Sequence, residues 1–137
     1  MNTTKARETA AIAAALMALP ASACVPELAG AARTLDTGRY TLAYRSVPPK
    51  IAVGEHFSLE VAVCANGGTP LPDSLSVDAQ MPEHRHGMNY KPGIKRVSAT
   101  RFRADGLMFH MPGRWEFDFE LRAAGRTDRV KQSEVFE

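Results

Sequence analysis

Two short strings of this sequence combine histidine with methionine. Together they hold three of the four histidines and every methionine after Met17, and they read Met81-Pro-Glu-His84-Arg-His86-Gly-Met88 and Met108-Phe-His110-Met111-Pro-Gly. Imidazole nitrogen binds zinc, copper, iron and nickel, whereas thioether sulfur is a soft ligand that selects for copper, above all Cu(I). The combination therefore predicts a copper site.

The spacing within each string allows its side chains to converge. In an extended backbone, alternate residues point to the same side, so His84, His86 and Met88 of the first string can face one point. Met108 and His110 of the second string share a side as well. Met111 falls on the opposite side, but the turn-forming Pro112 and Gly113 can redirect it. We therefore predict five metal ligands: His84, His86, Met88, His110 and Met111.

The composition of the two strings also indicates the function of the site. Neither contains a cysteine, which argues against a blue-copper electron-transfer centre and favours copper binding or delivery. The alternative is a module without metal that docks to another envelope protein, for instance in respiratory-complex assembly, with histidines that hydrogen-bond backbone groups of a broken loop. No nucleophile motif, phosphate-binding glycine loop or zinc-protease helix is present, so we expect no enzyme.

The remaining histidine and two of the methionines have simpler interpretations. His56 stands alone before an expected strand and is interpreted as a surface residue. Met81 and Met108 border expected strands, where methionine commonly fills gaps in a core.

The N-terminus predicts export. Lys5 and Arg7 precede an uncharged run at residues 10–19, which Pro20 and three small residues close. This is the pattern of a cleaved signal helix at residues 1–23, and the apolar run is about half as long as a membrane-spanning helix requires. We therefore expect a periplasmic protein.

The two cysteines leave an alternative open. Cleavage after residue 23 makes Cys24 the first mature residue, and an oxidising periplasm favours a disulfide between Cys24 and Cys64. The preceding Ala-Ser-Ala also resembles a lipoprotein box, in which Cys24 carries lipid and anchors the protein to the membrane. The two fates exclude each other.

Charge and length restrict the partners. Without the signal the net charge falls from +2 to +1, because Lys5, Arg7 and Glu8 leave with it. A nearly neutral chain with no basic block argues against nucleic acid, and against membrane contact other than through a lipid on Cys24. We expect a lead-in at residues 24–38 with at most one short turn of helix, followed by a single domain at 39–137.

The domain alternates apolar and polar residues in short runs between Gly, Pro and Asn. Residues 81–93 are too broken for a helix or a long strand and are expected to form a loop with at most one extended stretch. Trp115 and Phe117 are expected in the core. The pattern predicts an all-β, immunoglobulin-like or cupredoxin-like antiparallel β-sandwich of about seven strands, at residues 40–47, 57–64, 75–80, 94–98, 101–109, 114–121 and 127–136.

From Leu75 to Leu121 the chain resembles the YtkA-like family, small exported bacterial domains related to the FixH-like group. The resemblance rests on the first His/Met string, Met81 to Met88, and on Gly106-Leu-Met-Phe-His110-Met-Pro-Gly-Arg-Trp115-Glu116. It implies an immunoglobulin-like β-sandwich. It also implies a role in periplasmic copper handling or in the assembly of respiratory oxidases.

Overall fold

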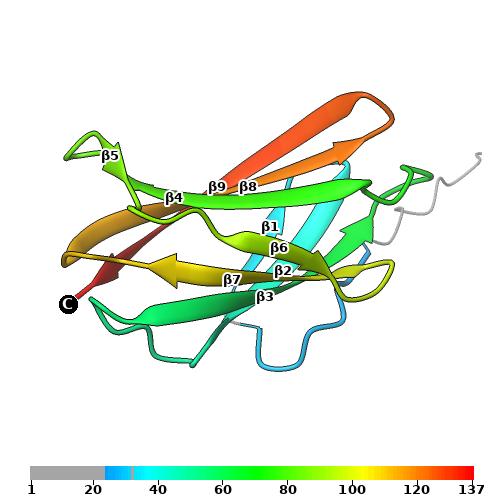
Figure 1. Ribbon diagram of the computed structural model, residues 1–137. Coiled ribbons are helices and arrows are strands. Elements are labelled where there is room, and N and C mark those ends of the chain that lie inside the picture. Colours follow the sequence, from blue (N-terminus) through cyan, green and yellow to red (C-terminus); the bar gives the residue numbers. More distant parts are fainter. Residues whose placement is uncertain (1–23, 32) are drawn as a thin grey trace, which may run out of the picture.

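The structure is a computed structural model in which residues 24–31 and 33–137 are described. The predicted signal helix at residues 1–23 lies outside this part of the chain. The described residues form nine β-strands in two sheets (Figure 1). Within them, no helix has the length and apolar character needed to cross a membrane.

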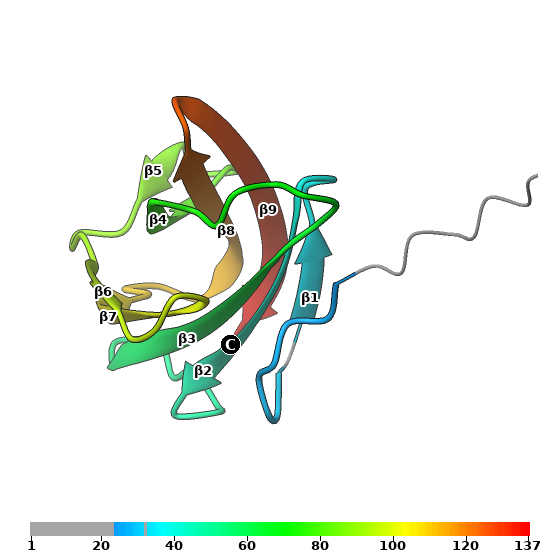
Figure 2. The same ribbon diagram turned by 90° about the vertical axis from the view of Figure 1, so that its right-hand side faces the viewer.

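Each sheet is built from antiparallel neighbours. The five-stranded sheet has the order β1 (Arg33–Asp36), β2 (Tyr40–Val47), β3 (His56–Ala65), β7 (Arg101–Met108) and β6 (Gly93–Arg96). The four-stranded sheet has the order β5 (His86–Gly87), β4 (Ser74–Met81), β8 (Gly113–Ala123) and β9 (Arg126–Phe136). Figure 2 shows the two sheets facing each other, and the prediction of an all-β antiparallel sandwich is confirmed.

The core lies between the sheets and follows from strand alternation. Every second residue of β4 is buried, from Leu75 to Met81, and the residues between them are exposed. β8 also buries every second residue from Trp115 to Ala123, but of the residues between them only Arg122 is exposed. The largest fully buried side chains are Trp115, Tyr40, Phe109, Phe117 and Phe119.

Two short strands lie outside the seven that the sequence predicted. The lead-in contains β1, an edge strand whose Leu35 is only partly buried, so its sequence carries little apolar alternation. The expected loop at residues 81–93 contains β5, which is only two residues long and follows a turn. These two short edge strands account for the difference between about seven expected strands and nine observed ones.

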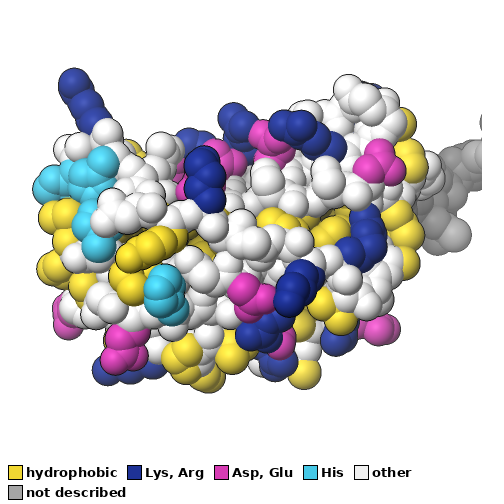
Figure 3. Space-filling model, viewed as in Figure 1, with side chains coloured by type: hydrophobic (Ala, Val, Ile, Leu, Met, Phe, Trp, Pro, Cys, Tyr) yellow, Lys and Arg dark blue, Asp and Glu magenta, His cyan; other side chains and the backbone are white. Residues whose placement is uncertain are grey.

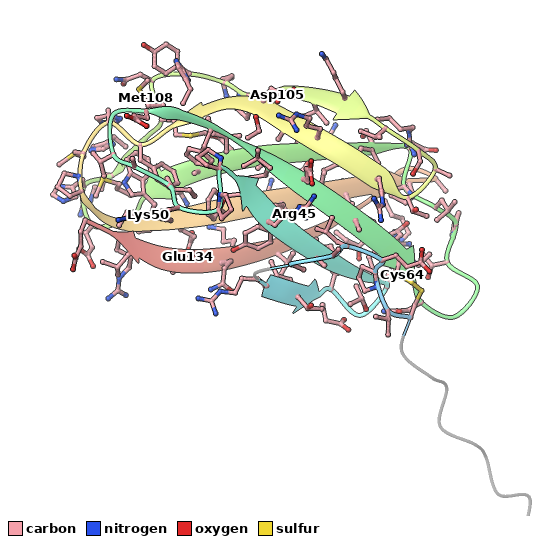
Figure 4. All side chains as sticks on the ribbon, turned by 90° about the horizontal axis from the view of Figure 1, so that it is seen from below. Arg45, Lys50, Cys64, Asp105, Met108 and Glu134 are labelled. Carbon is pink, nitrogen blue, oxygen red and sulfur yellow. A yellow bond between two sulfur atoms is a disulfide. The ribbon has the colours of Figure 1, made fainter. Side chains whose placement is uncertain are left out.

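The two ends of the sandwich differ in chemistry. β5, the end of β7 and the beginning of β8 meet at one end (Figure 1). At the opposite end, Cys24 forms a disulfide with Cys64, and their Cα atoms are 5.6 Å apart. Figure 4 shows Cys64 at the end of the molecule farthest from Met108. The candidate ligands and the disulfide are therefore separated by the length of the sandwich.

Candidate metal centre

β5 carries two of the predicted ligands on its core-facing side. His86 pairs with Met81 of β4, and the amide of Met88 continues the ladder by donating to the carbonyl of Ala79 at 3.2 Å. Paired residues of neighbouring strands point to the same face of a sheet. Because Met81 and Ala79 are buried in the core, His86 and Met88 point to the same side, and both are half-buried at the margin of the sheet.

His84 lies in the turn that joins β4 to β5. Its amide donates to the carbonyl of Met81 at 3.1 Å, and Arg85 next to it has a positive φ of 54°. His84 is therefore not part of the extended run that its spacing suggested, because a turn is needed to fold β5 back onto β4. Its exposed ring nevertheless lies 5.8 Å from the ring of His86, measured between centroids.

The connection from β7 to β8 brings the second string to the same place. The exposed ring of His110 has its centroid 5.1 Å from that of His86. Met111 is half-buried and packs against the core. Gly113 at the start of β8 has a φ of 130°, and a Cβ at this position would lie 2.7 Å from the Cε atom of Met81. Glycine thus allows the connection to pass close to the end of β4.

Trp115 forms the base of this group of residues. Its indole N–H donates to the Met111 carbonyl at 3.0 Å. The indole ring lies edge-to-face with two imidazoles, 5.4 Å from His110 and 6.0 Å from His86 between centroids. The strand pattern predicted Trp115 in the core, which is correct, but did not reveal its contacts with the two histidines. Its core-facing position directly after the second string is the signal that could have revealed them.

We call this group, His84, His86, Met88, His110, Met111 and Trp115, the His/Met cluster. Figure 3 shows histidine side chains gathered with hydrophobic side chains at the end of the molecule that carries β5. His86 is the common neighbour of the other two imidazoles. Its Nδ1 atom lies 3.2 Å from the Gly87 carbonyl oxygen. In the tautomer that protonates Nδ1, this contact leaves Nε2 free to bind a metal ion.

Carboxylates beside the cluster are engaged elsewhere. Glu83 pairs with Arg114 at 3.6 Å. Glu116, one residue after Trp115, lies on the other face of β8 and binds Lys131 at 2.7 Å, and this hydrogen bond holds the pKa of the carboxyl below its usual range. Among residues 24–31 and 33–137, no three His, Cys, Asp or Glu side chains are placed to hold a metal ion by themselves. A metal ion here would need thioether ligands, or rotation of the exposed imidazoles.

Three other candidates lie outside the cluster. Met81 is 1% exposed and belongs to the core. His56 pairs with Met108 on the five-stranded sheet. Cys64 is bound to Cys24 at the far end of the sandwich, so it offers no thiolate to the cluster.

The chain is a small antiparallel β-sandwich with histidine and methionine side chains gathered at one end. The chain is similar to a solved DUF4426 family protein from Pseudomonas aeruginosa PAO1, with a TM-score of 0.53 and 10% sequence identity over 76% of this chain and 93% of that chain. At this identity the likeness concerns the β-rich fold alone. No protein-family model and no curated protein matches the chain. Membership of the YtkA-like family therefore stays a prediction.

Proposed function

We propose that this protein binds Cu(I) in the periplasm and acts as a copper carrier or chaperone. The observation that carries the proposal is the position of the His86 ring, 5.1 Å from His110 and 5.8 Å from His84. The signal-like N-terminus and the resemblance to the YtkA-like family agree with it. The ligands we propose are His84, His86, Met88, His110 and Met111.

The ring separations suit a shared ion. Imidazole nitrogen binds metals at about 2.0–2.1 Å, so rings around one tetrahedral ion have centroids roughly 5 Å apart. The rings of His86 and His110 already have this separation, and the distance from His86 to His84 is less than an ångström longer. His84 and His110 are exposed, so their rings can rotate toward a shared ion without disturbing the core.

The donor set favours copper over zinc. Met88 and Met111 are half-buried beside the imidazoles, and the neighbouring carboxylates are held by Arg114 and Lys131. Thioether and imidazole ligands without carboxylate or thiolate suit Cu(I) better than zinc, calcium or magnesium. Two exposed imidazoles leave the ion accessible to an incoming ligand, as transfer to a partner requires. We propose no enzymatic activity.

Titration of the mature protein with Cu(I) against a competing chelator tests the proposal. We expect His84→Ala/His86→Ala to weaken Cu(I) binding by more than about 100-fold, because loss of ligands costs more than the 10–100-fold typical of outer-shell changes. Glu83→Gln in the same turn is the matched control and should leave the affinity unchanged. Weak Cu(I) binding by the unmodified protein, or equal affinity of the double variant, would contradict the proposal.

A docking module without metal is the second candidate. The contact between His86 Nδ1 and the Gly87 carbonyl favours it, because it is the kind of hydrogen bond a structural histidine makes. If this candidate is right, substitutions in the His/Met cluster should abolish capture of a partner from an envelope extract, and the capture should not depend on copper. Copper-dependent capture would favour the carrier.

A further inference from the structure

Histidine and methionine also meet outside the His/Met cluster, at the same end of the sandwich. His56 opens β3 and Met108 closes β7, and the two are direct partners in the register of these antiparallel strands. All four histidines of the chain, and all four methionines of its described part, thus lie on strand ends or turns at one end of the molecule. Figure 3 shows the histidines in two groups there, with hydrophobic side chains between them.

The pair faces solvent on the outer side of the five-stranded sheet. Phe57 and Leu107, the adjacent residues of the two strands, are buried in the core. Because successive side chains point to opposite faces, His56 and Met108 both point outward. His56 is exposed and Met108 is half-buried. The ring of Tyr90 lies edge-to-face with His56 at 5.1 Å between centroids.

We propose that His56 and Met108 form a second, more exposed Cu(I) site, with Tyr90 as its aromatic cover. Directly opposed residues of neighbouring strands have Cβ atoms about 4.5–5.5 Å apart, which lets one imidazole nitrogen and one thioether sulfur bind the same ion. The pair offers the same soft donors as the cluster, but fewer of them. The Tyr90 ring packs beside the imidazole and restricts its rotation. This inference rests on the proposed function.

Met108 and Tyr90 lie on segments that also carry residues of the first site, whereas His56 lies on β3, which carries none of them. Met108 precedes His110 by two residues, which is about 7 Å of strand. Tyr90 follows Met88 by two residues. An ion held by His56 and Met108 is therefore close to the cluster and open to solvent, which is the arrangement of a receiving site that passes copper inward or hands it to a partner.

The number of Cu(I) ions bound per chain tests the inference. We expect two ions in the unmodified mature protein, one tight and one at least tenfold weaker. His56→Ala/Met108→Leu should remove only the weak ion, and His84→Ala/His86→Ala only the tight one. Glu55→Gln, an exposed change beside His56, is the matched control and should keep both. Ag(I), a soft diamagnetic analogue, should shift the NMR signals of the Met108 methyl group and the His56 ring in the His84→Ala/His86→Ala protein.

The outcomes separate the two proposals. A single ion per chain that is lost in His84→Ala/His86→Ala and unaffected by His56→Ala/Met108→Leu would overturn the second site and leave the cluster standing. Two ions that both depend on the cluster residues would also overturn it. The absence of any tight Cu(I) binding would overturn the proposed function itself.

Discussion

Trp115 links the core to the candidate ligands at the scale of a single residue. Its side chain is fully buried, and its ring stacks on Phe109 with 4.5 Å between centroids. Its N–H fixes the Met111 carbonyl, while its ring borders His86 and His110. A residue with this position restrains three of the five proposed ligands without being a ligand itself.

We predict that Trp115→Phe weakens Cu(I) binding by about 10–100-fold, the usual cost of losing a group that orients metal ligands. Phenylalanine keeps an aromatic ring in the core but cannot donate to the Met111 carbonyl. Chelator competition measures the affinity, at a temperature where circular dichroism shows the variant folded. In the unmodified protein, emission of this sole tryptophan should change as Cu(I) binds.

Phe109→Leu provides the control for Trp115→Phe. It loosens the same part of the core but keeps the indole N–H and its contact with Met111. Its affinity for Cu(I) should stay within a fewfold of the unmodified protein. If both variants lose affinity equally, packing rather than ligand positioning explains the effect.

At the scale of strands and turns, the sequence predicted what alternation could reveal. β4 alternates strictly, and β8 buries every second residue from Trp115 to Ala123 although Glu120 between them is buried too, so the existence and orientation of both strands could be read directly. β1 and β5 are edge strands of only four and two residues, each joined by a short turn to the strand it pairs with, so neither is long enough to show a clear alternation. Sequence parity alone could therefore not place them.

In the candidate site, too, strand alternation predicted some positions and not others. Parity was sufficient to place His86 and Met88 on one side, since both extend along the margin of β4. It was insufficient for His84, because Arg85 adopts a positive φ and the turn changes the direction of the chain. The approach of His110 to His86 is a tertiary contact, which local spacing does not specify.

Gly113 should be the most sensitive position of the β7–β8 connection. A Cβ here would lie 2.7 Å from the Cε atom of Met81, and the backbone has a positive φ that alanine rarely adopts. We therefore expect Gly113→Ala to lower the free energy of unfolding by about 2–4 kcal/mol. Urea denaturation followed by circular dichroism measures the change.

Gly125 in the β8–β9 hairpin is the matched control. It also has a positive φ, of 73°, but a Cβ there meets no atom within 4 Å. Gly125→Ala should therefore cost only the backbone term, about 1–2 kcal/mol. Equal losses at both glycines would show that contact with Met81 has no energetic role.

At the scale of the whole molecule, the disulfide lies at one end of the sandwich and the His/Met cluster at the other. The disulfide closes a segment with a sequence separation of 40 and ties the residues before β1, which are half-buried or exposed, to the end of β3. The cluster lies at the other end, and the core lies between them. Changes at one end should leave the other unaffected.

We predict that Cys24→Ser/Cys64→Ser lowers the free energy of unfolding by up to about 4 kcal/mol, from the loop-closure entropy of the unfolded chain. Cu(I) affinity should not change. Denaturation and chelator competition on the same sample measure the two quantities. A parallel fall in affinity would show that the ends are coupled. Intact mass of the unmodified protein distinguishes a disulfide from lipid on Cys24.

The position of the disulfide also determines how the protein is oriented relative to anything attached on its N-terminal side. β3 alone spans roughly 25–30 Å between His56 and Cys64, at about 3.4 Å per residue. A tag or a surface linker attached before Cys24 therefore holds the molecule by its disulfide end. Its histidines and methionines then point away from the attachment, where a second protein can approach them.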